Sequence, residues 1–564
     1  MSNLSFRLAI LLLLGLFAAR PALSQDTVLP EGDAAAGRTL YMTGIGADGM
    51  PVRAMTKGDI AIDGTQVTCV SCHRPSGMGT SEGGSYVSPI TAGTLFNERK
   101  PNLALRLERF REYYKDPQTN AFKTETTRGR LRPAFTDETL AAAIRTGIDP
   151  AGRELDDVMP RFVLSDQDAA NLVAFMKTLS PEPSEGVDQF VHFATIIAGD
   201  IAPETADAHE KLMTMFADWI NKDIVTDLSR PGFSPYYRSD FTQSYREWRM
   251  HVWKLDGPPE SWPAKLDAYY EQQPVFAVIG PLVEADYSPV AEFCNRRATP
   301  CILPSTELPA PGDQEGGYTL YFSRGLLLEA DAAALWLSRE ATLPRHILQI
   351  SLGGPLSDRP AAQFLKAATT YPDLKVETRS VADEAELREA LETAGRDDAL
   401  LIWSGNRSDE AIRALNASQS RAGLILLTSK AHAAAVATLD PKLREKTRLI
   451  WPYDKPTAYH ADGLRVRAWI RSRRLPITEW RYQLQGYYAM KTTEFAMGHL
   501  LSDYYKDYLI EIIEHDIGAG FDPGPHPRLS LGPSQRYASK GAFIMRFDDA
   551  AKDGIEPITD WLIP

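Results

Sequence analysis

Cys69-Val70-Ser71-Cys72-His73 is the stretch of sequence around which the N-terminal part of the chain is organised. On a helical turn, residues three and four positions apart share one face, so both thiols and the imidazole project to the same side. Two thiols at this spacing can bond to the two vinyl groups of a haem, while the adjacent His73 binds the iron. The pattern therefore predicts one covalently attached haem c.

Zinc is the alternative occupant of a Cys-x-x-Cys-His pattern. A structural zinc site has four protein ligands, and residues 26–180 contain no Cys or His outside the motif. A six-coordinate haem also needs a second axial ligand, and we expect Met159, because Met/His ligation is common and Pro160 fixes the backbone beside it. Met78 is close to His73 in sequence and Met176 has the spacing of a helical core residue, so both are weaker candidates.

Composition limits the class of protein. The chain has 564 residues, of which 44% are hydrophobic and 24% charged, which is ordinary for globular protein and corresponds to about three to four domains or lobes. These values exclude a disordered chain or a coiled coil. Lys plus Arg number 61 against 74 Asp plus Glu, and the resulting net charge of −13 argues against nucleic acid as a partner.

Residues 1–24 have the pattern of a signal peptide. Arg7 precedes the apolar run Leu8–Ala19, which is too short to span a bilayer, and Ala22 and Ser24 give a small-x-small cleavage site. A membrane anchor is the alternative, and the length of the run disfavours it. No later stretch of about 18 apolar residues is present. The sequence thus predicts a periplasmic protein with no membrane span in the mature chain.

The rest of the chain divides at a linker. We expect a first domain at residues 26–180, a linker at residues 181–188 that is marked by two prolines and small or acidic residues, and a second domain at residues 189–564. The second domain alternates short β-rich runs with helix-length segments, which predicts parallel sheets with crossover helices in two lobes. The predicted strands are Phe190–Ile197, Met250–Leu255, Val275–Gly280, Cys301–Pro304, His346–Ser351, Ala399–Trp403, Gly423–Thr428 and Arg448–Trp451.

A basic stretch interrupts the first domain. Residues 106–133 contain eight basic side chains against four acidic ones, a local excess of positive charge in an acidic protein. Such a stretch can steer an acidic redox partner by long-range attraction. A solvated helix face or loop is an equally open interpretation.

Residues 33–180 resemble a class I cytochrome c domain. The opening helix Asp33–Thr43, the CVSCH motif, the loop Val87–Ile90, residues Gly147–Arg153 and the Met159 loop match the family's order of elements. The resemblance implies a mainly α fold, a role in electron transfer, and a carbonyl of Pro89 that accepts the N–H of His73. The stretches before CVSCH and at residues 97–133 are longer than a minimal cytochrome needs.

Residues 189–564 resemble type I periplasmic solute-binding proteins of the branched-chain amino-acid group. The resemblance rests on Val275–Pro281 with its following helix, on Thr299–Thr306, on the crossing segment Tyr318–Arg324 and on Gln485–Ala489. It implies an α/β fold of two lobes with a small ligand held between them, at the carboxyl ends of the strands.

The same resemblance places the candidate ligand-binding residues. Ser305 and Thr306 belong to the first lobe, and Trp403 to Asn406 end a strand of the second. Glu284 and Asp286 stand where an amino-acid binder has hydroxyl residues, so we expect a cationic or polyol-like solute rather than a simple carboxylate. The alternative is that these two acids have no ligand and lie on a solvated loop or at a helix N-terminus, where acidic residues are favoured.

The remaining cysteines, Cys294 and Cys301, are expected to form a disulfide in an oxidising compartment. Taken together, the motifs predict a periplasmic mono-haem electron-transfer protein with a fused solute-binding module and a periplasmic redox partner. A ligand sensor or transport receptor with a haem input is the alternative. We expect no enzymatic activity, since no catalytic motif is present, although a haem with an open coordination position would act as a peroxidase.

Overall fold

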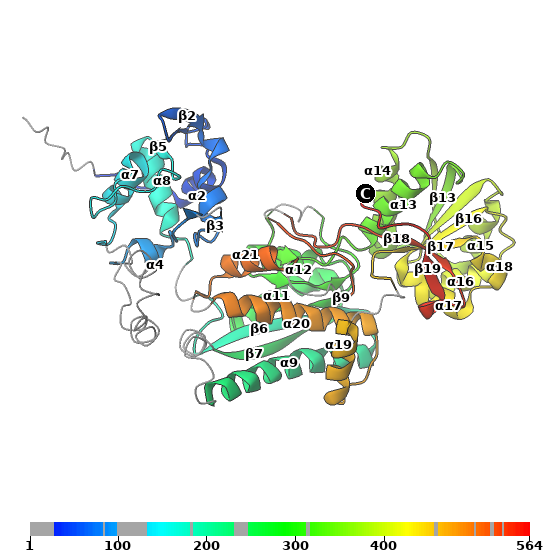
Figure 1. Cartoon of the computed structure of the whole chain (residues 1–564). Helices are drawn as coiled ribbons and strands as arrows, with labels where there is room; N and C mark the ends of the chain where they lie inside the picture. Colours follow the sequence, from blue (N-terminus) through cyan, green and yellow to red (C-terminus); the bar gives the residue numbers. More distant parts are fainter. Residues whose placement is uncertain are drawn as a thin grey trace, which may run out of the picture. The chain divides into compact units, whose positions relative to one another are not determined.

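The structure is a computed structural model, and it describes residues 28–82, 85–98, 132–180, 184–229, 246–311, 316–455, 461–500, 503–518, 524–532 and 535–564. The predicted signal peptide and nearly all of the basic stretch lie outside these residues. The chain divides into two compact units, residues 1–181 and 182–564 (Figure 1). No helix in the described ranges is long and apolar enough to cross a membrane.

The first unit is mainly helical. Its helices are α2 (Ala34–Thr43), α3 (Cys69–His73), α4 (Ala92–Leu95), α7 (Asp137–Thr146) and α8 (Asp166–Met176). An antiparallel sheet has the order β2-β1-β5, formed by β1 (Arg53–Thr56), β2 (Ile60–Asp63) and β5 (Arg161–Val163). A separate short ribbon pairs β3 (Ser81–Glu82) with β4 (Ser85–Tyr86).

The close crossing of α2 and α8 sets the position of α3. A Cβ at Gly37 would overlap the backbone of Asn171, so only glycine permits this approach. The Asn171 amide oxygen also accepts a hydrogen bond from the backbone N–H of Asp33, the N-cap of α2, at 2.9 Å. Farther along α2, the hydroxyl of Tyr41 donates to the carbonyl of Arg74 at 2.6 Å. Because Arg74 is the C-cap of α3, this bond fastens the Cys-x-x-Cys-His turn to the helix pair.

The second unit contains two seven-stranded sheets, which define its two lobes. The first-lobe sheet has the order β11-β9-β6-β8-β10-β12, with β7 also paired to β6, and every pairing in it is parallel. Its strands are β6 (Phe190–Gly199), β7 (Glu247–Leu255), β8 (Ala277–Ile279), β9 (Leu282–Glu284), β10 (Cys301–Ile302), β11 (Ser305–Thr306) and β12 (Thr319–Leu320). Its long helices are α9 (Pro203–Ser229), α11 (Trp262–Gln272), α12 (Ser288–Arg296), α19 (Ala461–Ser472), α20 (Trp480–Leu500) and α21 (Lys506–Asp516).

The second-lobe sheet has the order β14-β13-β15-β16-β17-β18-β19, parallel up to β17 and antiparallel beyond it. Its strands are β13 (His346–Ser351), β14 (Lys375–Ser380), β15 (Asp398–Trp403), β16 (Leu424–Leu427), β17 (Thr447–Trp451), β18 (Phe543–Phe547) and β19 (Ile555–Pro557). The helices of this lobe are α13 (Leu326–Arg339), α14 (Pro355–Ala368), α15 (Glu384–Thr393), α16 (Ser408–Ala417), α17 (His432–Thr438) and α18 (Pro441–Arg444).

The order of the described elements takes the chain between the lobes three times. It leaves the first lobe after β12, returns after β17 to build α19, α20 and α21, and crosses again to β18. This order confirms the predicted fold, in which a mainly α unit is followed by a two-lobed α/β unit. It also means that residues at the strand ends of both sheets can face a common space.

Candidate functional site

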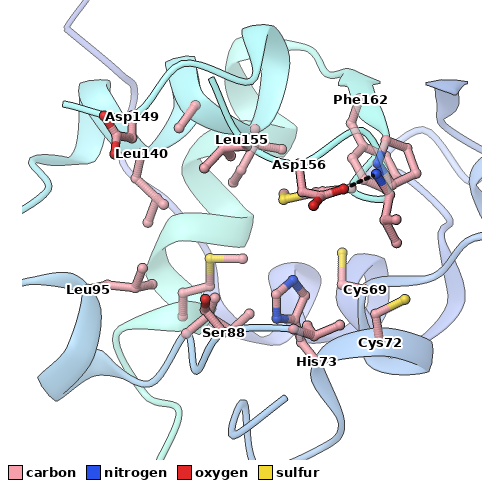
Figure 2. Close-up of a pocket in the computed structure, with 18 of the residues that line it drawn as sticks. Cys69, Cys72, His73, Ser88, Leu95, Leu140, Asp149, Leu155, Asp156 and Phe162 are labelled. Carbon is pink, nitrogen blue, oxygen red and sulfur yellow. Dashed lines mark hydrogen bonds between the residues drawn. The ribbon is translucent and has the colours of Figure 1, made fainter. Parts of the chain in front are cut away.

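A cavity in the first unit collects the residues of the Cys-x-x-Cys-His motif. Cys69, Cys72 and His73 project from the single turn of α3 (Figure 2). Met159 and Met176 also line the cavity. Apolar side chains fill most of the remaining surface, namely Val87, Ile90, Leu95, Phe135, Leu140, Ile144, Leu155, Val158, Phe162 and Leu172.

Burial sets the ionisation of the motif. It lowers the pKa of His73 to about 4, and the backbone of Ser88 opposes this shift. The imidazole is therefore neutral at pH 7, the state in which histidine binds a metal. Nδ1 of His73 is buried, and it has no hydrogen-bond partner among the described residues. The backbone of Ser88 is the polar group that affects the pKa of His73, and the expected hydrogen bond to the carbonyl of Pro89 is not found among the described residues.

The two thiols also fit a covalent cofactor. Cys69 and Cys72 are free cysteines three positions apart, and both line the cavity. Burial raises the pKa of Cys69 to about 12, so its thiol is uncharged. Within the described residues, no group of three or more His, Cys, Asp or Glu side chains could hold a metal ion. Two thiols and a neutral imidazole at the wall of an apolar cavity suit a haem c.

Met159 lies in the loop between α7 and β5. Its backbone N–H donates to the carbonyl of Asp156 at 3.1 Å, which closes a tight turn. Arg161, at the start of β5, donates to the carbonyls of Met159 and Leu155. Met176 also lines the cavity, from the end of α8, so the described cavity brings two methionines to its walls.

Arg132 lines the cavity, although the sequence analysis placed it in a stretch expected to face a partner or solvent. Of the eight basic residues of the stretch, Arg132 alone is among the residues that the structure describes, and only 8% of its surface is exposed. Its guanidinium donates to the carbonyls of Thr94, Leu95 and Pro133 and stacks 4.4 Å from the ring centre of Phe135. Arg132 is therefore not part of an exposed docking surface, and the other basic residues of the stretch lie outside the described residues.

A second cavity, of about 940 Å³, lies between the lobes of the second unit. Its walls come from the end of β9, from the segments after β6, β11, β16 and β17, from α19 and from the start of α20. The charged lining comprises seven acidic against four basic side chains: Asp200, Glu204, Glu284, Glu307, Asp454, Glu479 and Asp553 against Lys430, Lys455, Arg467 and Arg481. Four aromatic residues also line it, namely Trp451, Tyr453, Trp480 and Tyr482.

Two glutamates of the cavity lining, Glu284 and Glu307, are half-buried and buried, respectively. The hydroxyl of Tyr482 donates to Glu284, and the ammonium of Lys430 lies 3.9 Å from the same carboxylate. The hydroxyl of Tyr453 donates to Glu307 at 2.9 Å. The side chain of Glu307 is 8% exposed, and the guanidinium of Arg481 lies 3.6 Å from it. Each carboxylate therefore has one phenol donor and one nearby cation.

The other predicted ligand-binding residues do not line this cavity. Asp286 forms an ion pair with Arg359 of α14 at 2.8 Å. Ser305 is buried, and the Thr306 hydroxyl accepts a hydrogen bond from a backbone N–H two residues later. Trp403 is fully buried in the core of the second lobe, where its indole N–H donates to Gln349 at 2.9 Å.

The last of these residues, Asn406, is exposed on the turn after β15. The end of β15 thus does not reach the cavity, whereas the ends of the next two strands in the sheet, β16 and β17, do. Sequence reasoning missed Glu307, Lys430, Tyr453 and Arg481. The one available signal was the position of the first three, each within three residues of the end of a strand.

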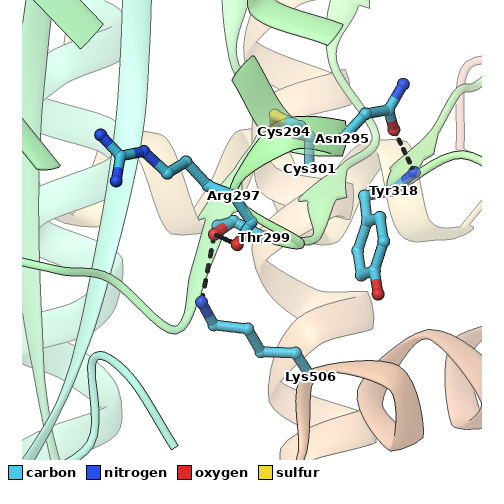
Figure 3. Close-up of a disulfide and its surroundings, with 7 residues drawn as sticks. All are labelled: Cys294, Asn295, Arg297, Thr299, Cys301, Tyr318 and Lys506. Atoms are coloured by element: carbon cyan, nitrogen blue, oxygen red, sulfur yellow. Dashed lines mark hydrogen bonds between the residues drawn. A yellow bond between two sulfur atoms is a disulfide. The ribbon is translucent and has the colours of Figure 1, made fainter. Parts of the chain in front are cut away.

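Cys294 and Cys301 form a disulfide that joins α12 to β10 (Figure 3). Both residues are fully buried, and their Cα atoms are 6.3 Å apart. Nearby, the ammonium of Lys506 donates to the hydroxyl of Thr299 at 3.1 Å. The disulfide therefore lies in the core of the first lobe, away from the charged cavity lining.

Comparison with known proteins gives a family for the first unit and a fold for the second. Residues 34–180 match the family model of cytochrome c. No curated protein matches the sequence significantly. Among solved structures, a branched chain amino acid ABC transporter protein from Thermus thermophilus with bound valine is similar with a TM-score of 0.50 and 12% identity, over 66% of this chain and 97% of that one.

Two further solved structures are also similar. A fatty acid ABC transporter substrate-binding protein from Thermomonospora curvata has a TM-score of 0.49 and 14% identity, over 68% of this chain and 95% of that one. A possible leucine/isoleucine/valine-binding protein from Rhodopirellula baltica has a TM-score of 0.48 and 14% identity, over 67% and 98%. The chain therefore joins a cytochrome c domain at residues 34–180 to a domain with the fold of type I periplasmic binding proteins.

Proposed function

We propose that the protein is a periplasmic electron carrier with one haem c and that its second domain binds a small molecule. The observation that carries the first part is the convergence of Cys69, Cys72, His73 and Met159 on one apolar cavity. In this proposal the two cysteines hold the haem covalently, and His73 and Met159 bind its iron. The bound group supplies one-electron chemistry, and the apolar walls exclude water and favour the higher reduction potential that Met/His ligation gives.

Location outside the cytoplasm has a second support besides residues 1–24. The buried disulfide Cys294–Cys301 is typical of an oxidising compartment such as the periplasm. Covalent attachment of haem to Cys69 and Cys72 is also coupled to export. The electron acceptor or donor would then be a second periplasmic protein.

Spectroscopy of two methionine variants tests the proposed ligand set. Met159→Ala should abolish the sulfur-to-iron band at the red end of the visible spectrum and lower the reduction potential, because Met ligation raises it. Met176→Ala is the matched control, since Met176 lines the same cavity. If Met176→Ala abolishes the band and Met159→Ala does not, the ligand is Met176. Binding of carbon monoxide to the reduced wild type would instead indicate an open coordination position and the peroxidase alternative.

The charged cavity of the second domain supports the receptor function. An excess of acidic side chains and four aromatic rings favour a cationic solute, because carboxylates and π faces both attract cations. We propose that Glu284 and Glu307 face this solute. A sensor or transport receptor with a haem input uses the same cavity, and it differs in that ligand binding would change the reduction potential.

A thermal-shift screen tests the cavity. A ligand at 100 times its dissociation constant stabilises a protein by about 2.7 kcal/mol, which a melting curve detects. Amines and polyols should raise the melting temperature of the second domain before leucine, isoleucine or valine do, and Glu284→Gln should weaken a cationic hit. Glu389→Gln, on the exposed face of α15, removes the same charge outside the cavity and should have no effect. Tight binding of leucine that is indifferent to Glu284→Gln would contradict the charge argument.

A further inference from the structure

The loop that carries Met159 turns three of its backbone carbonyls toward one side chain. The guanidinium of Arg161 donates from Nη2 to the carbonyl of Leu155 at 2.9 Å. From Nη1 it reaches the carbonyls of Asp156, at 3.5 Å, and of Met159 itself. Hydrogen bonds from a charged donor are stronger than those between neutral groups, so Arg161 holds the loop at both of its ends.

Arg161 is itself held in place from two sides. Its backbone pairs with Met55 in the β1–β5 ladder, which fixes the start of the side chain. Its guanidinium lies against Gly147, the C-cap of α7, where an added Cβ would overlap the Nε and Cζ atoms. Gly147 has a φ of 75°, and its carbonyl accepts the backbone N–H of Leu155 at 2.7 Å. Gly147 thus supplies both the space for the guanidinium and an anchor for the loop.

The other interactions of the loop are local or exposed. Within the loop, the Asp156 carboxylate accepts the backbone N–H of Val158 at 3.0 Å. Lys57 pairs with Asp157 at 2.9 Å, but their side chains are 81% and 60% exposed. An ion pair so exposed contributes little to stability. Arg161 is therefore the side chain whose hydrogen bonds fasten the loop to the body of the domain, together with the backbone bond from Leu155 to Gly147.

We propose that Arg161, seated on Gly147, is the positioning residue that keeps the Met159 sulfur directed at the haem iron. Arg161 does not line the cavity and takes no part in ligation. Its role is to prevent the loop from relaxing and releasing the sulfur. The inference rests on the proposed function, in which Met159 is the axial ligand.

The test uses the full-length haem-loaded protein with Arg161→Gln and Arg161→Lys. In a titration to alkaline pH, the sulfur-to-iron band should disappear about one pH unit or more earlier in Arg161→Gln, an increase of about tenfold in the displaced population. Arg161→Lys keeps the charge but not the fork that reaches several carbonyls, so we expect an intermediate shift. The reduction potential at neutral pH should fall in the same order.

Two further variants separate a positioning role from general destabilisation. Gly147→Ala leaves Arg161 intact but displaces its guanidinium and strains the left-handed backbone at residue 147, so the shift should be at least as large as in Arg161→Gln. Lys57→Gln removes the exposed ion pair of the same loop and should leave the titration unchanged. Amide hydrogen exchange over residues 155–159 should rise in Arg161→Gln and Gly147→Ala, and not in Lys57→Gln. If Arg161→Gln does not fold, the same measurements on Gly147→Ala and Arg161→Lys test the proposal.

Different experimental outcomes would contradict this inference and the proposed function. If Met159→Ala abolishes the band while Arg161→Gln and Gly147→Ala titrate like the wild type, the positioning role of Arg161 is overturned and the ligand assignment stands. If Met159→Ala leaves the band unchanged, the ligand assignment itself is wrong, and the inference is overturned with it.

Discussion

Glu329 provides a sharp test of the electrostatics of the second domain. It lies on α13, is fully buried, and accepts hydrogen bonds from the backbone N–H of Ser429 at 2.9 Å and from the Ser429 hydroxyl at 2.5 Å. Burial raises the pKa of Glu329 from 4.5 to about 8, against the opposing effect of Ser429. This carboxyl braces the loop that carries Lys430 into the cavity.

The raised pKa implies a stability that falls as pH rises. Between pH 4.5 and pH 8 the folded protein holds a proton on Glu329 that the unfolded chain has released, so unfolding becomes more favourable with increasing pH. Each pH unit in this window costs about 1.4 kcal/mol, and the whole window costs a few kcal/mol. Glu329→Gln removes the proton exchange and keeps an amide oxygen that can accept from Ser429. Its stability relative to the wild type should therefore rise steadily from pH 5 to pH 8.

Urea unfolding at pH 5, 6, 7 and 8, followed by far-ultraviolet circular dichroism, measures this difference. Groups that titrate identically in both proteins cancel, so the comparison isolates Glu329. Glu340→Gln, at the exposed end of the same helix, is the matched control and should remain parallel to the wild type. If the difference between Glu329→Gln and the wild type stays constant across these pH values, Glu329 is ionised in the folded protein and the reasoning fails.

Two more predictions concern the second domain, one on a contact between its lobes and one on its disulfide. Arg359 donates to Asp286 and to the carbonyl of Pro309, both at 2.8 Å, so Arg359→Ala should weaken the contact between the lobes by about 1–2 kcal/mol for this partly exposed pair. A double-mutant cycle with Asp286→Asn measures the coupling, and purely additive losses would exclude it. Serine at Cys294 and Cys301 should lower the unfolding free energy by about 2–3 kcal/mol. Mass spectrometry without reduction checks the bond, and two free thiols would refute it.

Much of the fold was predictable because buried strands have a clear signature. The predicted strand His346–Ser351 coincides with β13, and Ala399–Trp403 lies within β15. By contrast β14, Lys375–Ser380, is charged and mostly exposed at a sheet edge, so it lacks the apolar run that marks a buried strand.

The candidate sites were predictable to different degrees. The haem motif is a contiguous sequence whose geometry follows from one helical turn, so its convergence on a cavity could be expected. The second cavity depends on the order of strands in two sheets, which places Lys430 and Tyr453 beside it and leaves Trp403 in the core. No pattern in the sequence predicted the role of Arg161, because that role depends on the directions in which the carbonyls of a folded loop point.

The measurement that tests the central claim most directly is the mass of the exported, full-length protein after denaturation and acidic organic extraction of haem. The account predicts that the polypeptide retains the mass of one haem and that fragmentation places this mass on the peptide containing Cys69 and Cys72. The double substitution Cys69→Ser and Cys72→Ser should abolish it. A polypeptide that loses all haem on extraction, or that carries two free thiols at these positions, would contradict the account.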